Sequence, residues 1–154
     1  MPVLPEGLTT NMPADLHRSS TLANTDWKTK TMSENGAKVI AGVREVAAER
    51  PDHVFGEMRV YVYANEPRCL VGHGLWRAGL IDRKFIKRRI ANGASITSFE
   101  MRDVLKGFDQ DEIDWLAIVQ DQQDLRHTWS KSVEWADQVM SVLRAAVSFT
   151  SANF

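Results

Sequence analysis

The stretch that decides the fold reads DQDEIDWLAIVQDQQ and runs from Asp109 to Gln123. Asp109 is typical of a helix N-cap, and Asp111 and Glu112 lie where the positive end of the helix dipole favours carboxylates. Apolar residues then cover most of the circumference: Ile113, Trp115, Leu116, Ile118 and Val119. Because a helix that is apolar nearly all round belongs in the interior, this stretch predicts the central helix of a helical domain.

The last predicted helix begins near Thr128 and carries two apolar stripes. The main stripe holds Trp129, Val133, Ala136, Met140, Leu143 and Val147, and the stripe beside it holds Trp135, Val139, Val142 and Ala146. Since this face is too wide for one neighbour, we expect the helix to pack against two elements or against another chain. Trp135, Val139 and Val142 are therefore interface candidates, together with Trp27 from upstream.

Two further helices are predicted before the central one. The first is capped by Ser33 or Asn35, ends at Pro51 and has one apolar stripe, made by Val39, Ile40, Val43, Val46 and Ala47. The second runs from Arg68 to about Ala78 and directs Leu70, Val71, Leu75 and Trp76 toward the core. Gly79 suits the position just after its end.

Alternation with period two between Met58 and Tyr63 predicts one strand. Gly56 could turn back a short partner strand around His53 to Phe55. A single hairpin is not stable alone in water, so we expect it to lie against the helices.

Length and composition indicate one domain of average polarity, with 154 residues, 44% hydrophobic and 25% charged. We divide it into an irregular N-terminal arm (1–33), a helical domain (34–147) with a β-ribbon near 53–63, and a C-terminal tail (148–154). The predicted class is mainly α, with about five helices and one small β-hairpin.

Several features favour a cytoplasmic protein without membrane segments. No stretch approaches the roughly 18 apolar residues that span a bilayer. The start, from Met1 to Thr10, has no secretory signal pattern, and Cys69 is the only cysteine. A formal net charge of −1 argues against a protein built mainly to coat nucleic acid.

The N-terminal arm is rich in proline, serine and threonine and shows no persistent period. Two interpretations stay open. The arm lies on its own domain, with Leu16, Leu22 and Trp27 as anchors, or it docks on a partner.

Cys69 and His73 lie four residues apart on one face of a predicted helix. A thiol near a helix N-terminus with a histidine base is the arrangement of a cysteine nucleophile. No catalytic signature accompanies the pair, and cysteine usually packs as a small hydrophobic residue, so the structural interpretation is favoured. No further ligands have zinc-finger spacing, and we predict no metal and no cofactor.

The segment after Gly79 is basic, with Arg83, Lys84, Lys87, Arg88 and Arg89 interleaved with Phe85, Ile86 and Ile90. Followed by a weaker helix over Ser98 to Lys106, it suggests a helix-turn-helix that binds DNA. A solvated helix face is the more common meaning of such a run. An acidic stretch follows, containing Asp109, Asp111, Glu112, Asp114, Asp121 and Asp124, and it either pairs with the basic residues or steers a different partner.

Two segments carry a resemblance: PRCLVGHGLWRAGL, from Pro67 to Leu80, and WLAIVQDQQDLRHTW, from Trp115 to Trp129. They resemble small uncharacterised proteins of actinobacteria and their phages, which show P-x-C-L-V-G and W-x-x-x-V-Q-x-x-Q-D patterns. The residues that fit are Pro67, Cys69, Gly72, Leu75, Gly79, Gln120 and Asp124. The resemblance implies a host or phage cytoplasm and no particular chemistry. Apart from the resemblance, Gly72 and Gly74 are typical of a helix that packs closely against a neighbour.

Three functions follow in order of preference. The first is a non-enzymatic protein–protein interaction or regulatory protein, such as a phage or mobile-element modulator of a host protein. The second is a DNA-binding regulator that uses the basic residues 83–89. The third is a thiol enzyme that uses Cys69 and His73.

Overall fold

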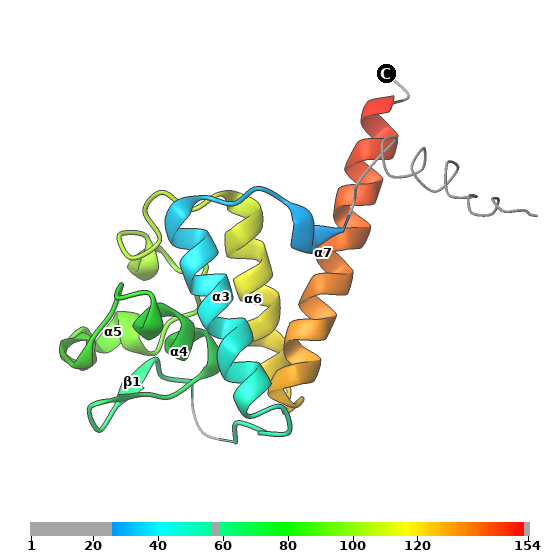
Figure 1. Ribbon diagram of the computed structural model, residues 1–154. Coiled ribbons are helices and arrows are strands. Elements are labelled where there is room, and N and C mark those ends of the chain that lie inside the picture. The colour runs from blue at the N-terminus through cyan, green and yellow to red at the C-terminus, as the bar shows by residue number, and fades with distance from the viewer. Residues whose placement is uncertain (1–25, 57–58, 153–154) are drawn as a thin grey trace, which may run out of the picture. The chain divides into compact units, whose positions relative to one another are not determined.

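The computed structural model describes residues 26–56 and 59–152, and Figure 1 shows their arrangement. Within these residues there are five α-helices, α3 to α7, and one antiparallel two-stranded hairpin, which confirms the predicted mainly helical class. The chain divides into two units. We call Thr31–Met140 the helical body, and the described residues of the other unit, 26–30 and 141–152, the terminal unit. None of the described helices is long and apolar enough to cross a bilayer.

Helix α6 (Gln110–Asp124) lies inside the helical body beside α3 (Glu34–Glu49), as Figure 1 shows. Every residue from 111 to 120 is at least partly buried, and Trp115, Leu116 and Val119 have no exposed surface. Its N-terminus has the capping box between Asp109 and Glu112. The prediction of a central helix is therefore confirmed.

Helix α3 crosses α4 (Leu70–Arg77) at glycines. A Cβ atom added at Gly74 would lie 2.5 Å from Val43 Cγ2 and 2.8 Å from the Val39 carbonyl oxygen. One added at Gly42 would lie 3.2 Å from Gly74 Cα. These distances explain the Gly72-His73-Gly74 sequence as close packing, in agreement with the sequence analysis.

The hairpin pairs β1 (Val62–Tyr63) with β2 (Glu66–Pro67). The predicted partner around His53 to Phe55 is wrong, because β1 pairs with β2, the strand that follows it. Ala64 and Asn65 have φ of 55° and 65°, the signs that a two-residue type I′ turn requires. Val54 instead forms an isolated bridge with Thr128. Residue alternation alone does not reveal on which side of a strand its partner lies.

Helix α7 (Trp129–Ala152) begins where predicted, and its first part belongs to the helical body. Trp129, Ala136 and Met140 are buried there. Arg44 of α3 donates two hydrogen bonds to Asp137, at 2.7 and 2.8 Å, and Asp137 also accepts one from Trp115 Nε1 at 2.9 Å. This carboxylate joins α3, α6 and α7.

The terminal unit joins the residues around Trp27 to the later part of α7. The Trp27 N–H donates to Ser141 Oγ at 2.9 Å, and Arg144 donates to the Asp26 carbonyl oxygen at 2.8 Å. Leu143 and Val147 were expected to continue the buried stripe, but they are 48% and 66% exposed, so the core stripe ends at Met140. The proposed anchors Leu16 and Leu22 lie outside the described residues.

Candidate functional site: the basic segment

The basic segment, which we define as Asp82 to Asn92, is made of two short helices: the 3-10 helix η2 (Arg83–Lys87) and the single α-turn α5 (Arg89–Asn92). Asp82 caps η2, and its carboxylate accepts from the Lys84 N–H at 2.8 Å. Ile81 and Phe85 are buried, and the Phe85 ring meets Tyr61 edge-on with centroids 6.0 Å apart. These apolar residues hold the start of the segment against the helical body.

The far end of the segment is held by Asn92, which is buried. Its side chain accepts from the Val62 N–H and donates to the Val62 carbonyl oxygen, both at 2.9 Å, as a neighbouring strand would. Its own carbonyl oxygen accepts from the Tyr61 N–H at 3.1 Å. Because both ends are fixed, the backbone between them keeps a defined path and presents its basic residues to solvent.

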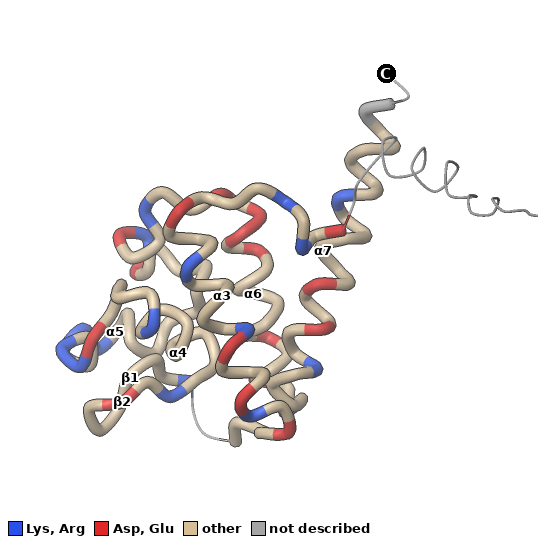
Figure 2. Tube along the Cα trace, in the orientation of Figure 1, with Lys and Arg blue, Asp and Glu red and all other residues tan. Residues whose placement is uncertain are grey.

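The basic side chains of this segment are all exposed. Arg88 bonds both carboxylate oxygens of Asp103, at 3.0 and 3.1 Å, and the Glu100 carbonyl oxygen. Among the residues that the structure describes, no ion pair is recorded for the other four: Arg83, Lys84, Lys87 and Arg89. Figure 2 shows the resulting group of cations beside α5.

The ion pair found in the acidic stretch has its partner outside the basic segment. Asp124 accepts from Arg59 at 2.7 and 3.0 Å, and Asp137 rather than an acidic-stretch residue binds Arg44. For Asp124, the partner therefore lies outside the basic segment.

The second helix of the expected helix-turn-helix is not formed. Over Ser98 to Lys106 the chain makes only the 3-10 helix η3 (Phe99–Met101) followed by turns as far as Gly107. Phe99 of this segment is 70% exposed, whereas Met101 is buried. A one-turn element cannot supply the recognition helix that fills a major groove.

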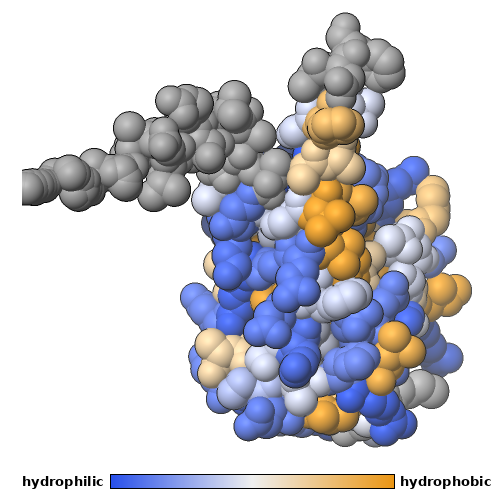
Figure 3. Space-filling model, turned by 90° about the vertical axis from the view of Figure 1, so that its right-hand side faces the viewer, coloured by the Kyte–Doolittle hydropathy of each residue, from blue (hydrophilic) through white to orange (hydrophobic). Residues whose placement is uncertain are grey.

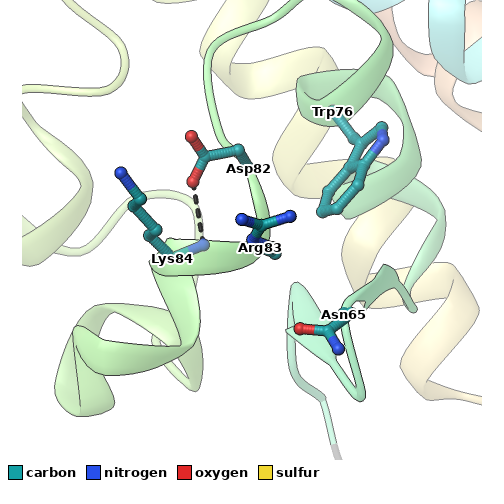
Figure 4. Close-up of a pocket in the computed structure, with 5 residues that line it drawn as sticks. All are labelled: Asn65, Trp76, Asp82, Arg83 and Lys84. Carbon is teal, nitrogen blue, oxygen red and sulfur yellow. Dashed lines mark hydrogen bonds between the residues drawn. The ribbon is translucent and has the colours of Figure 1, made fainter.

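A pocket of about 470 Å³ lies at the start of the segment, lined by Asn65, Trp76, Asp82, Arg83 and Lys84. Figure 4 shows the Trp76 ring and the Arg83 guanidinium facing the same space, with Asn65 on a further wall. Trp76 is half-buried and lines this pocket, whereas its helical position predicts a place in the core, and Asn65 has no signal of its own in the sequence. The signal that could have found them is Gly79, whose turn brings the basic segment back against the end of α4.

The surroundings of Cys69 and His73 do not favour a nucleophile and base. Cys69 is completely buried, its Sγ accepts from the Gly72 N–H at 3.3 Å, and burial raises the pKa of the thiol to about 12. Burial, and secondarily the charges of Arg50 and Arg77, lower the pKa of His73 to about 4, and its ring packs edge-on against Trp129. Cys69 acts as the N-cap of α4, a structural role.

The interface candidates fall into two groups. Trp27 is completely buried within the chain, so it offers no surface to a partner. Trp135 and Val142 are 49% and 67% exposed, and Val139 is half-buried.

Three polar side chains of α6 are buried, which the sequence pattern did not predict. Glu112 accepts from the Ser33 N–H, the Ser33 hydroxyl and the Asp109 N–H, at 2.6, 2.6 and 2.9 Å. Gln120 accepts from the Ile96 N–H at 2.8 Å, and Gln123 accepts from the Leu70 N–H at 2.7 Å. They tie α6 to chain segments that would otherwise have unsatisfied backbone groups.

Comparison with protein families, with characterised proteins and with solved structures found no match to this chain. The resemblance to actinobacterial and phage proteins therefore stays a prediction.

The residues that carry that resemblance have structural roles here. Gly72 allows close approach, since an added Cβ would lie 2.6 Å from the Tyr61 carbonyl oxygen, and Gly79 has φ of 77°. Gln120 donates to the Tyr61 hydroxyl at 2.9 Å, and Asp124 pairs with Arg59. The motif describes how the body is held together, and the basic segment lies outside it.

Proposed function

We propose that this protein is a non-enzymatic nucleic-acid-binding protein whose contact surface is the basic segment. The observation that carries the proposal is the set of four exposed cations, Arg83, Lys84, Lys87 and Arg89, with no recorded ion pair among the described residues. Exposed cations that have no recorded ion pair among the described residues can bind phosphates, and binding releases the counterions that surround the phosphates.

The structure of the same segment favours single-stranded nucleic acid over a duplex as the ligand. A helix-turn-helix protein that recognises duplex DNA needs a helix long enough to enter the major groove. The segment has only η2 and the four-residue α5, with η3 after them. Single strands are bound instead by a positively charged surface that follows the backbone, which needs no long helix.

The test is a comparison of two triple variants with equal net charge. Arg83→Ala/Lys84→Ala/Lys87→Ala removes cations of the segment, whereas Lys28→Ala/Lys38→Ala/Lys131→Ala removes exposed cations from other elements. Fluorescence anisotropy with a labelled single strand at low salt should show affinity about tenfold or more lower for the first variant and nearly unchanged for the second. Absence of binding by the wild type, or equal losses in both variants, would contradict the proposal.

A second function, contact with another protein, is favoured by apolar side chains on the terminal unit. Val142, Leu143 and Val147 of α7 are 67%, 48% and 66% exposed, and Figure 3 shows hydrophobic residues gathered along this helix. Two copies that pair this helix face would bury the same residues on each side. Sedimentation of Val142→Glu/Val147→Glu should then show a loss of self-association, and a wild type that stays monomeric at high concentration would exclude it.

A further inference from the structure

The pocket at the start of the basic segment combines an aromatic ring, two cations and an amide. Trp76 contributes a half-buried ring from the last turn of α4, Asn65 comes from the hairpin turn, and Asp82, Arg83 and Lys84 come from the start of η2. The rest of the segment presents the cations Lys87, Arg88 and Arg89 together with the exposed aliphatic side chains of Ile86 and Ile90, and no aromatic ring is exposed there.

Local backbone geometry brings these walls together. Gly79 ends α4 with φ of 77°, and the Leu80 N–H donates to the Leu75 carbonyl oxygen at 3.0 Å, which turns the chain sharply back. Asn65 has φ of 65° at the second turn position of the hairpin. The Leu80–Leu75 hydrogen bond and the β1–β2 pairing fix the backbone of both turns, so the fold itself brings the pocket walls together.

The cations of the pocket suit a phosphate and the ring suits a flat aromatic group. Neither Arg83 nor Lys84 has a recorded ion pair among the described residues. A base stacked on tryptophan needs no particular sequence, because every nucleobase has a flat π-face. The Asn65 amide can both donate to and accept from a base edge.

Asp82 is the acidic residue among those that line the pocket. Its Oδ1 accepts from the Lys84 N–H at 2.8 Å, so part of its hydrogen-bonding capacity is used in capping η2. A carboxylate repels phosphate but accepts from the amino group of a base, as acidic side chains do with cytosine. The base therefore belongs against the Trp76 ring, and the phosphate on the basic side chains that face solvent.

We propose that this pocket takes one unpaired nucleotide, with its base stacked on Trp76 and its phosphate on Arg83 and Lys84. The proposal rests on the proposed function, which it deepens by naming the unit that is recognised. The nucleotide is either part of a single strand or free, and both share the chemistry of an aromatic base next to a phosphate.

The experiment compares an oligo-dC strand with an abasic strand of the same length, because the abasic strand has the phosphates without the bases. The wild type should bind oligo-dC about tenfold or more tightly than the abasic strand. Trp76→Ala should lower oligo-dC affinity to about that of the abasic strand and leave abasic binding unchanged. Trp135→Ala, which removes an exposed tryptophan on α7, is the matched control and should change neither.

Trp76→Phe guards against loss of fold, since it keeps an aromatic ring and should retain part of the preference for bases. Competition between dCMP and the labelled oligo-dC strand separates the two possible ligands. Weak competition by dCMP indicates that the pocket takes a nucleotide within a strand, and full competition indicates that it takes a free nucleotide. Equal wild-type affinity for oligo-dC and the abasic strand would overturn the proposal that the pocket binds a base, but not the proposal that the basic segment binds phosphates. Absence of binding to both would overturn the pocket and the proposed function together.

Discussion

Helix α6 and the basic segment both carry polar side chains on the same helical body, but they use them in opposite ways. The buried polar groups of α6 bond inside the chain: Glu112 to Ser33 and Asp109, and Gln123 to the Leu70 N–H. The cations at 83, 84, 87 and 89 are exposed and have no recorded ion pair among the described residues. Polar groups that are satisfied internally hold the fold, whereas those left facing solvent are available to a partner.

The largest stability effect is expected at Glu112. Glu112→Ala removes the acceptor of three hydrogen bonds and leaves the Ser33 and Asp109 donors unsatisfied. We expect the free energy of unfolding to fall by about 3 kcal/mol or more. Glu34→Ala, which changes an exposed carboxylate paired with Lys38, should cost about 0.5 kcal/mol or less. Urea denaturation of both variants checks the difference, and equal losses would contradict the internal role of Glu112.

Packing at the glycine crossing should give the next largest effect. Gly74→Ala places a methyl group against Val43 and the Val39 carbonyl oxygen. Overpacking costs about 1–3 kcal/mol and outweighs the gain in helix propensity of about 1 kcal/mol. Thermal unfolding should therefore show a lower midpoint, and a raised midpoint would mean that α3 and α4 are not in such close contact.

The histidine packed on Trp129 makes stability depend on pH. The pKa of His73 in the folded chain is about 4, below its ordinary value of 6.5, so the unfolded chain binds more protons between these values. Folding stability is therefore complete above about pH 6.5 and is lost as the pH falls toward 4. The wild type should lose more stability than His73→Gln between pH 7 and pH 5. Chemical denaturation at both pH values measures this, and parallel losses would show that His73 is not titrating.

The smallest stability effect is expected for the basic segment itself. Lys87→Ala/Arg89→Ala removes two exposed side chains that have no recorded ion pair. The free energy of unfolding should change by about 0.5 kcal/mol or less. A large loss in denaturation would show that these cations hold the fold, which would remove the contrast with α6.

The sequence predicts the helices of the body, including α6, better than it predicts the basic segment. Helical periodicity and capping predicted α3, α4, α6 and α7 because a wide apolar face and a capping residue such as Ser33 or Asp109 are local signals. The partner of β1 could not be predicted, since the turn depends on positive φ at Ala64 and Asn65.

The candidate site was predicted only in part. The basic residues 83–89 were identified from charge alone, but the expected continuous helix became η2 and α5 because Phe85 and Asn92 are fixed by distant residues, Tyr61 and Val62. The pocket joins Asn65, Trp76 and Arg83 from three separate elements. A pocket formed by residues that are far apart in the sequence cannot be recognised from a local sequence pattern.

The most direct test of the central claim, that the basic segment binds nucleic-acid phosphates, is the salt dependence of single-strand affinity. For the wild type and Lys87→Ala/Arg89→Ala, the logarithm of the association constant is plotted against the logarithm of salt concentration, with Lys38→Ala/Lys131→Ala as the charge-matched control. Each lost phosphate contact should reduce the slope by about 0.7, so the segment variant should be shallower by about 1.4 and the control unchanged. Equal slopes for the wild type and the segment variant would contradict the claim.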